Sequence, residues 1–282
     1  MKKYSSILET NLKKVLNLQK LEIIVPILLV LFFSAYSIPS KKKTFKNTAF
    51  TVVIDAGHGG HDPGCMHDGV KEKEVTLAIA LAIGAKLKEQ SPEIKIIYTR
   101  AGDHFISLWE RAAIANKNNA DLFISIHCNS TKNVSVSGTE TFAMGLNQSA
   151  GNLDVAKREN QVVLLEDDYL TRYEGFDPNS PESHIYFSLS QNAHMEQSIS
   201  LAAKVENQIS EKMKRPSRGV KQAGFVVLWK TKMPSILIET GFLSNTQDRL
   251  FLKSKVGVSK MAEGIVNAIL EYKKTYQTSP SK

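Results

Sequence analysis

"TVVIDAGHGGHDPG", residues Thr51–Gly64, places a short apolar run directly before a loop rich in glycine and histidine. The β-branched residues that open this stretch predict a buried strand. Glycines then free the backbone for a tight turn, and two imidazoles, His58 and His61, follow the strand closely. Because open α/β sheets form their sites beyond the carboxyl ends of their strands, this junction is the first candidate for a functional site.

Strands and helices alternate outward from this junction. Apolar runs predict strands, and runs with apolar residues at helical spacing predict helices. In chain order the predicted elements are a strand at 50–55, a helix at 72–90, a strand at 94–100, a helix at 107–120 opened by a Ser107 N-cap, strands at 122–127 and 138–144, a long helix at 190–214, a strand at 235–240 and a terminal helix at 259–272. This alternation predicts an α/β fold, a single domain with a mostly parallel central sheet flanked by helices.

The N-terminal region has the order of an export signal. Lysines precede an apolar stretch, Ile23–Ile38, which is slightly short for a membrane-spanning helix. Residues 1–38 therefore fit either a cleaved signal peptide or an N-terminal membrane anchor. Both send the rest of the chain out of the cytoplasm, to the periplasm or cell envelope. Polar, lysine-rich residues 39–49 predict a linker, residues 50–275 predict the folded domain, and residues 276–282 predict a tail.

Composition and charge narrow the class of protein. With 42% hydrophobic and 23% charged residues, the chain can bury a globular core. A net charge of +8 suits an anionic polymer or a membrane surface but is no nucleic-acid signature by itself. The two cysteines, Cys65 and Cys128, exclude a disulfide scaffold, although a single bridge between them stays open. We expect a monomer that binds no nucleic acid.

Three predicted strands each end in a side chain suited to metal chemistry. "VVIDAGH" ends in His58, "LFISIH" in His127 and "SILIE" in Glu239. The carboxyl ends of parallel strands meet at one edge of a sheet, so these side chains are expected to lie together. A lone histidine at a strand end is usually structural, but three such residues together indicate a site.

The motifs around these residues resemble the zinc-dependent N-acetylmuramoyl-L-alanine amidases of bacterial cell walls, the amidase 3 family. Five stretches carry the resemblance in order, from about Thr51 to Tyr272: "VVIDAGHGGHDPG", "KEKEVTLAIA", "DLFISIHCNS", "SGTETFAM" and "MPSILIETGFLSN". The resemblance implies hydrolysis of the amide between the lactyl group of N-acetylmuramic acid and L-alanine of the peptidoglycan stem peptide. It implies a role in wall remodelling and daughter-cell separation.

The resemblance also implies which residues act. His58, Glu72 and His127 correspond to the ligands of one zinc ion, and Glu239 to the catalytic glutamate. Two histidines and one carboxylate with an open fourth position are typical of a catalytic zinc site, whose bound water is acidified by the metal. Glu239 is then expected to take a proton from the water and pass it to the leaving amine.

Neighbouring residues compete for these roles. Glu74 lies two residues after Glu72 and is interpreted as a first-turn residue favoured by the helix dipole. His61 and His67 are interpreted as solvated loop residues, and Cys128 as a core residue on the opposite face of its strand from His127. The family pattern therefore favours Glu72 over Glu74.

Supporting and substrate-binding residues are less well determined. Asp55 and Asp62 can each accept a hydrogen bond from a ligand histidine, and the sequence does not choose between them. Arg100 and Arg218 fall at strand or loop ends where the family has basic residues, and could meet substrate carboxylates. Structural salt bridges explain both arginines equally well.

Residues 147–195 depart from the minimal family pattern. Some family members that act in cell division carry an insertion here, which covers the zinc site until a partner protein displaces it. This insertion contains the carboxylates Glu159 and Glu166, either of which could reach the open metal position and block catalysis. An alternative is a surface excursion that shapes the substrate groove.

Two other functions stay open at this point. A zinc peptidase that cuts bonds within the stem peptide needs the same metal set, and an inactive wall-binding scaffold needs only the fold. A scaffold has no chemical need for His58, Glu72, His127 and Glu239 together, which favours an enzyme. Peptidoglycan is the expected partner, with an activator protein as a second.

Overall fold

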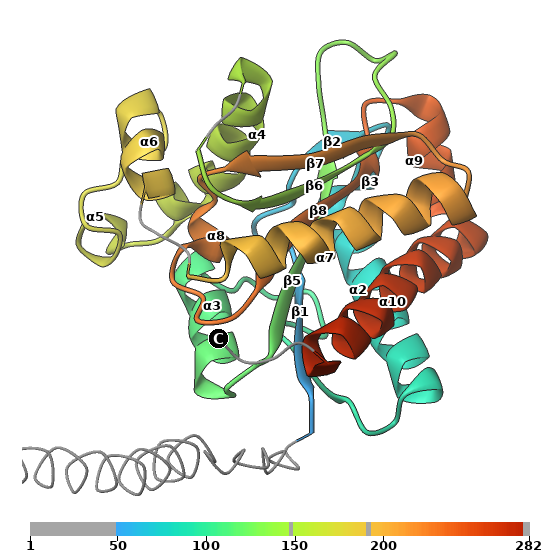
Figure 1. Ribbon diagram of the computed structural model, residues 1–282. Helices are drawn as coiled ribbons and strands as arrows, with labels where there is room; N and C mark the ends of the chain where they lie inside the picture. Colours follow the sequence, from blue (N-terminus) through green and yellow to red (C-terminus); the bar gives the residue numbers. More distant parts are fainter. Residues whose placement is uncertain (1–48, 147–148, 190–192, 279–282) are drawn as a thin grey trace, which may run out of the picture. The chain divides into compact units, whose positions relative to one another are not determined.

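A six-stranded sheet forms the centre of the structure, a computed structural model that describes residues 49–146, 149–189 and 193–278 (Figure 1). The predicted signal or anchor and nearly all of the predicted linker, residues 1–48, lie outside the described residues. No helix within the described ranges combines the length and the apolar composition that a membrane span requires.

The sheet is mostly parallel, as predicted. Its strand order is β4-β1-β5-β8-β6-β7, and the only antiparallel pair among the described strands of this sheet is β6 with β8. The strands are β1 (Thr51–Ala56), β4 (Lys95–Tyr98), β5 (Leu122–Asn129), β6 (Thr139–Met144), β7 (Ser217–Ala223) and β8 (Ser235–Phe242). A separate two-stranded hairpin, β2 (Met66–His67) with β3 (Val70–Lys71), follows the opening loop.

Both faces of the central strands are covered, which explains why β1, β5 and β8 are buried along their whole length. In β1, Val52 and Ile54 belong to one hydrophobic core, and Val53 belongs to the other. This alternation follows from the two-residue period of a strand. Residues on both faces are therefore buried, and the sheet separates two cores.

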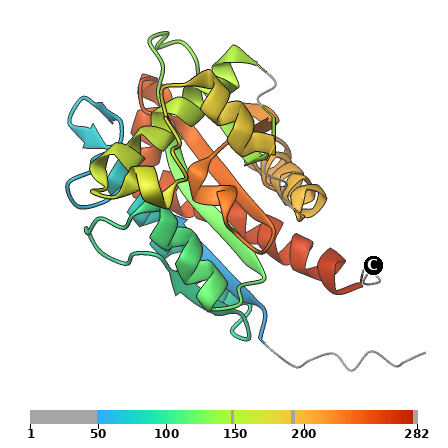
Figure 2. The same cartoon turned by 90° about the vertical axis from the view of Figure 1, so that its left-hand side faces the viewer.

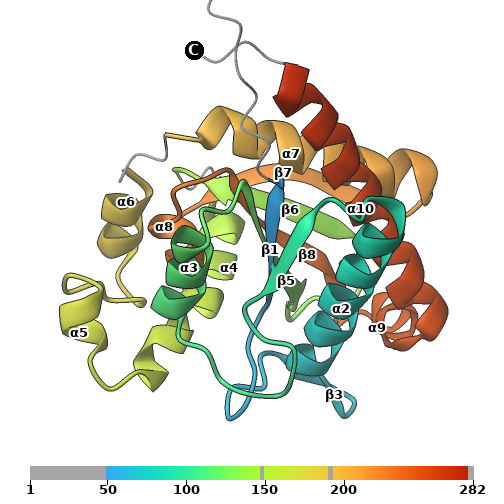
Figure 3. The same cartoon turned by 90° about the horizontal axis from the view of Figure 1, so that it is seen from below.

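One core lies under three long helices. They are α2 (Glu72–Gln90), α7 (Met195–Asn207) and α10 (Lys255–Thr278), with α9 (Thr246–Lys253) beside them (Figure 3). Val75, Ile79, Ile83 and Leu87 line the buried face of α2 at helical spacing. The predicted bounds of this helix are confirmed.

The other core lies under α3 (Leu108–Lys117), α8 (Val226–Trp229) and the segment predicted as an insertion, residues 147–195, which is called the insertion below and is described here without residues 147–148 and 190–192. The insertion contains α4 (Ala150–Asn160), the 3₁₀ turn η1 (Gln161–Leu165), α5 (Tyr169–Arg172) and α6 (Pro181–Leu189). Figure 2 looks onto this side, where the yellow-green helices lie in front of the sheet. The insertion therefore packs on the same face of the sheet as α3.

Two helix predictions differ from the structure. The long helix expected at 190–214 is α7 over Met195–Asn207, continued by one π-helical turn, η2 (Gln208–Lys212), and the first three residues of that prediction, 190–192, lie outside the described residues. The terminal helix extends to Thr278, into the segment predicted as a tail, because the ring of Tyr276 stacks on that of Tyr272 and packs against that of Phe50. The Ser107 N-cap is confirmed, since its hydroxyl accepts a hydrogen bond from the N–H of Glu110 at 3.2 Å.

The candidate functional residues lie at one edge of the sheet. β1, β5 and β8 run parallel, so their carboxyl ends lie together, and the antiparallel strand β6 begins at the same edge. His127 on β5, Glu239 on β8 and Glu140 on β6 are successive register partners across three strands. Their side chains lie on the same face of the sheet as those of Phe123, Leu237 and Phe142, which belong to the core beneath the insertion.

Candidate metal centre

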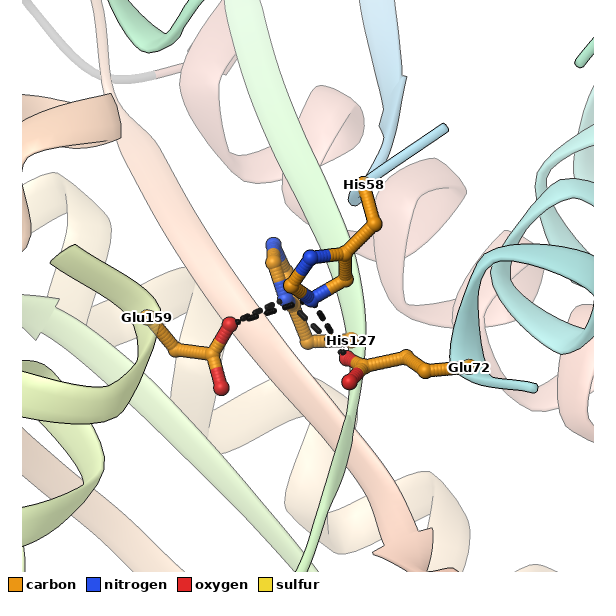
Figure 4. A group of neighbouring side chains, drawn as sticks. All are labelled: His58, Glu72, His127 and Glu159. Carbon is orange, nitrogen blue, oxygen red and sulfur yellow. Dashed lines mark ion pairs between the residues drawn. The ribbon is translucent and has the colours of Figure 1, made fainter. Parts of the chain in front are cut away.

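Four buried side chains converge at this edge (Figure 4). Nε2 of His58 lies 3.1 Å from Oε1 of Glu72 and 3.2 Å from Oε2 of Glu159. Nδ1 of His127 lies 3.2 Å and 2.9 Å from the same two oxygens. The four ligand-type atoms all lie within 4.8 Å of one another. His58, Glu72, His127 and Glu159 are called the metal cluster below.

Glu72 is held by the backbone of two other segments. It is the first residue of α2, is fully buried, and accepts hydrogen bonds from the N–H of Cys128 at 2.8 Å and the N–H of Cys65 at 2.9 Å. Glu74 is exposed on the same helix. The structure therefore brings Glu72, the predicted residue, into the cluster and leaves Glu74 at the surface.

His58 is oriented by its own loop. Its backbone is left-handed, with φ of 60°, which turns the side chain back over the end of β1. Nδ1 lies 2.8 Å from Oδ2 of Asp62, and Asp62 also accepts a hydrogen bond from the N–H of Gly64. This carboxylate leaves Nε2 of His58 free to face the cluster.

Asp55, the other aspartate considered for this support, has a different role. It accepts hydrogen bonds from Arg111 at 2.8 Å and from the hydroxyls of Thr99 and Ser125 at 2.6 Å each. All of these groups are buried. Arg111 also donates to the backbone carbonyls of Ala56 and His58, so this ion pair holds the end of β1 rather than an imidazole.

His127 requires a glycine beside it. A Cβ on Gly57 would lie 2.5 Å from Cε1 of the His127 ring, closer than any carbon atoms pack. Gly57 belongs to the glycine-rich loop, and its N–H bonds to the carbonyl of Ile126. This requirement explains one of the glycines that follow the opening strand.

The cluster fits a metal ion. Nε2 of His58, Nδ1 of His127 and Oε2 of Glu159 are buried and make no hydrogen bond of good geometry, although they point at one another. Burial works to lower the pKa of His127, but the charge of Glu159 and the close contacts with the carboxylates of Glu159 and Glu72 together outweigh it and raise that pKa to about 9. This surplus of negative charge suits a cation, and imidazole nitrogens with carboxylate oxygens are ligands that zinc and related metals accept.

Glu239 lies beside the cluster. It is fully buried, and its Oε2 has no hydrogen-bond partner. Burial raises the pKa of Glu239 well above its usual range, the charge of Glu159 adds to this effect, and the charge of Arg158 opposes it. A buried carboxyl with a raised pKa, next to a metal cluster, is suited to holding and releasing a proton.

Arg158 is a residue that sequence analysis missed. It precedes Glu159 on α4 and donates from Nε to Oε1 of Glu159 at 2.9 Å, and from Nη2 to Oε1 of Glu239 at 3.2 Å. The adjacent Arg–Glu pair, beside a carboxylate already suspected of reaching the metal, was the signal that could have identified it. Arg158 and Glu159 together bring the insertion into contact with the whole site.

Two of the candidate residues make structural contacts away from the cluster. Glu166 does not reach the cluster, because its carboxylate accepts from the N–H of Leu108 at 3.0 Å and from the hydroxyl of Tyr173 at 2.8 Å, beside the start of α3. Arg100 is 2% exposed and donates to the carbonyls of Ala56, Gly57, Lys73 and Gly102. Its guanidinium holds the histidine loop and offers no surface to a substrate carboxylate.

The remaining candidates lie outside the cluster. Arg218 pairs with Glu140, the register partner of Glu239. His61 is exposed and its ring packs on that of Phe105, as expected of a loop residue. Nε2 of His67 lies 2.9 Å from the hydroxyl of Ser130. Cys65 and Cys128 are both free thiols, and Cys128 is buried as predicted.

Comparison with known proteins identifies the family of the chain. The family model described as N-acetylmuramoyl-L-alanine amidase matches residues 52–271. The chain is 33% identical over 242 residues to the amidase AmiA of Salmonella typhimurium, covering 85% of this chain and 81% of AmiA. It is 35% identical to the protein YqiI of Bacillus subtilis, over 79% of this chain and 84% of YqiI.

Solved structures show the same fold. The crystal structure of the N-acetylmuramoyl-L-alanine amidase from Clostridium difficile 630 aligns with a TM-score of 0.60 and 29% identity, over 81% of this chain and 98% of that one. The amidase AmiC2 of Nostoc punctiforme aligns with a TM-score of 0.56 and 29% identity, over 80% of this chain and 98% of that one. The chain belongs to the N-acetylmuramoyl-L-alanine amidase family.

Proposed function

We propose that this amidase is a zinc enzyme whose metal ligands are His58, Glu72 and His127, and whose insertion keeps it inactive until it is displaced. The bond cut is the amide between the lactyl group of N-acetylmuramic acid and L-alanine of the stem peptide. The observation that carries the proposal is the convergence of orphaned imidazole nitrogens on Glu72 at the carboxyl edge of the sheet.

Each residue has a distinct part in the reaction. Zinc, when bound, polarises the amide carbonyl and makes water a better nucleophile. Asp62 holds the ring of His58 in one orientation, and the amides of Cys65 and Cys128 hold Glu72. Glu239 accepts a proton from the attacking water and donates it to the leaving nitrogen, which needs the proton because an amide anion is a poor leaving group.

The insertion supplies a carboxylate where the reaction needs an open position. Oε2 of Glu159 lies about as close to the two imidazoles as Oε1 of Glu72 does. A catalytic zinc site requires one position for water or substrate, and Glu159 takes that position in the closed form. Activity therefore requires α4 to move away, for which a partner protein that binds the insertion is the simplest agent.

The proposed substrate is peptidoglycan, and the proposed location is outside the cytoplasm. Peptidoglycan carries carboxylates on its stem peptides, and we infer that Arg218 meets one of them. Its side chain pairs with Glu140 and is 40% exposed, which supports this role. The export segment at residues 1–38 would deliver the chain to the periplasm or cell envelope. One zinc ion per chain and a monomer complete the proposal.

A single digestion experiment tests the activity. Purified sacculi are incubated with the full chain carrying Glu159→Ala, with and without EDTA, and the released fragments are analysed by mass spectrometry. Intact stem peptides with a free L-alanine amine, lost with EDTA and restored by zinc, are the expected products. Shortened stem peptides would identify a zinc peptidase, and no release would leave an inactive wall-binding scaffold.

A deletion tests the inhibition. Removal of residues 150–190 is expected to raise the release of peptides from sacculi, provided that circular dichroism and thermal melting show a folded protein. Equal or lower release from a well-folded deletion variant would contradict autoinhibition. The insertion would then be a wall of the substrate groove.

A further inference from the structure

Two adjacent residues of α4 contact two different parts of the site. Glu159 meets the imidazoles of the metal cluster, and Arg158 meets Glu239. We propose that this pair imitates the two charged groups that amide hydrolysis creates, and that Arg158 is a second inhibitory contact, directed at the catalytic glutamate. The inference rests on the proposed autoinhibition and extends it from one contact to two.

Each nitrogen of the Arg158 guanidinium has its own acceptor. Nε donates to Glu159 at 2.9 Å, Nη1 to the carbonyl of Ser130 at 3.0 Å, and Nη2 to Glu239 at 3.2 Å. Ser130 directly follows β5, the strand that carries His127. A planar guanidinium bonded in three directions is fixed in position, which distinguishes this contact from a flexible surface ion pair.

The chemistry of the reaction explains the pairing. Water adds its oxygen to the amide carbon and the carbon–nitrogen bond breaks. One product is a carboxylate, and the other is an amine that takes up a proton and becomes a cation. In the closed structure the carboxylate of Glu159 lies at the imidazoles, and the cation of Arg158 lies at Glu239. The two groups occupy the parts of the site that the two products leave.

Electrostatics makes the two contacts depend on each other. Glu72, Glu159 and Glu239 are three carboxylates buried close together, and like charges in a buried site repel strongly. Arg158 bonds two of them at once, so its charge offsets the repulsion that Glu159 meets on entering. Without Arg158, Glu159 is expected to hold its place less well and Glu239 is expected to be available for proton transfer.

The insertion contains a second arginine–glutamate pair that serves as a matched control. Arg172 lies 3.7 Å from Glu166 and 2.8 Å from Asp168. Glu166 bonds to the start of α3, and neither Arg172 nor Glu166 contacts Glu239 or the metal cluster. Loss of Arg172 therefore removes an arginine ion pair from the insertion without touching the site.

The test compares Arg158→Ala, Arg158→Gln, Glu159→Ala and Arg172→Ala in the full, zinc-loaded chain. The measured quantity is the rate of peptide release from sacculi without any activator. Loss of a charge-assisted hydrogen bond to a buried carboxylate predicts a rate about tenfold higher for both Arg158 variants. Arg172→Ala is expected to stay near the wild-type rate. Methylguanidinium, at matched ionic strength, should inhibit Arg158→Ala again and leave Arg172→Ala unaffected.

A second measurement does not depend on activity. Hydrogen exchange of the α4 backbone amides is followed in EDTA-treated protein, where the contact between Arg158 and Glu239 involves no metal. Exchange is expected to be faster in the Arg158 variants than in Arg172→Ala. The inference would be overturned if Glu159→Ala raised the rate of peptide release while both Arg158 variants matched Arg172→Ala in rate and in hydrogen exchange. Autoinhibition by Glu159 would still hold in that case. No release by any variant or by the deletion would overturn autoinhibition itself.

Discussion

The metal cluster is built from two halves that are held in different ways. His58, Glu72 and His127 are fixed by the sheet, by backbone amides and by Asp62, around strands β1 and β5 and helix α2. Glu159 belongs to the insertion, which docks through side chains: Asn160, for example, bonds to the carbonyl of Gly224 and the N–H of Val226. The first half keeps its geometry if the second half leaves.

In the proposed mechanism, this difference separates the residues of the reaction from those of its inhibition. Segments that move in regulation come from the less stable parts of a fold. In the insertion, α5 has no buried residue, and Leu164, Leu165, Leu170 and Leu189 are exposed. In the sheet, every residue of β5 and β8 is buried. Changes to the two halves should therefore have opposite effects on activity.

The largest effect is expected from breaking the fixed half. His127→Ala removes an imidazole that no neighbour can replace, and should lower zinc content and reduce activity by about a thousandfold or more. Mass spectrometry measures the zinc content per chain. Peptide release from sacculi, with His127→Ala introduced into the Glu159→Ala variant, measures the activity. His61→Ala, a change of the exposed loop histidine, is the control. Full zinc occupancy in His127→Ala would contradict the ligand assignment.

A smaller loss of zinc binding is expected when Asp62, the carboxylate that orients His58, is removed. Asp62→Ala frees the ring of His58 to rotate and should weaken zinc affinity by about 10–100-fold, as measured by competition with a chelator. Asp103→Ala provides the comparison, since Asp103 bonds to the N–H of Gly60 and to Lys73 in the same region without contacting an imidazole. Equal losses in the two variants would mean that loop stability, rather than ring orientation, sets the affinity.

Substitution of Glu159, in the half that belongs to the insertion, should raise activity rather than lower it. Glu159→Ala is expected to raise the basal rate about tenfold, because it removes a charge-assisted contact from the closed form. Glu166→Ala should instead lower the free energy of unfolding by about 1–3 kcal/mol, because it leaves the N–H of Leu108 and the hydroxyl of Tyr173 without their partner. Rates and thermal melts of both variants separate the two roles, and activation by Glu166→Ala as large as that by Glu159→Ala would remove the distinction.

The smallest effect is expected away from both halves. Ser107→Ala removes the N-cap of α3 and should cost about 1 kcal/mol of unfolding free energy. Zinc content and basal rate should not change, since Ser107 contacts neither half of the cluster. A melt with chemical denaturant measures the loss, and a change of rate larger than the change of stability would indicate that α3 controls how the insertion docks.

Much of the fold could be predicted from local pattern. Strand β1, helix α2 and the ends of β5 and β8 follow from runs of β-branched residues and from helical spacing, because each element lies over a core that sets its period. The predicted ligands His58, Glu72 and His127 come together because they stand at strand or helix ends, where the connection to the sheet leaves little freedom.

Other contacts depend on three-dimensional packing that no local pattern records. Glu159 and Glu166 look equivalent in the sequence, and only the packing of α4 against β7 and the hydrogen bond between Glu166 and the start of α3 separate them. Arg100 and Arg111 look like surface cations, yet both are buried because they satisfy carbonyls of the histidine loop. Arg158 joins Glu239 across 81 residues of chain, a contact that spacing alone cannot indicate.

Anomalous diffraction at the zinc edge, from crystals of the zinc-loaded full chain, tests the central claim most directly. The account predicts one peak per chain, located among His58, Glu72, His127 and Glu159, with Arg158 bonded to Glu239. A peak at Cys65 or Cys128, or no peak among these four residues at full zinc loading, would contradict it.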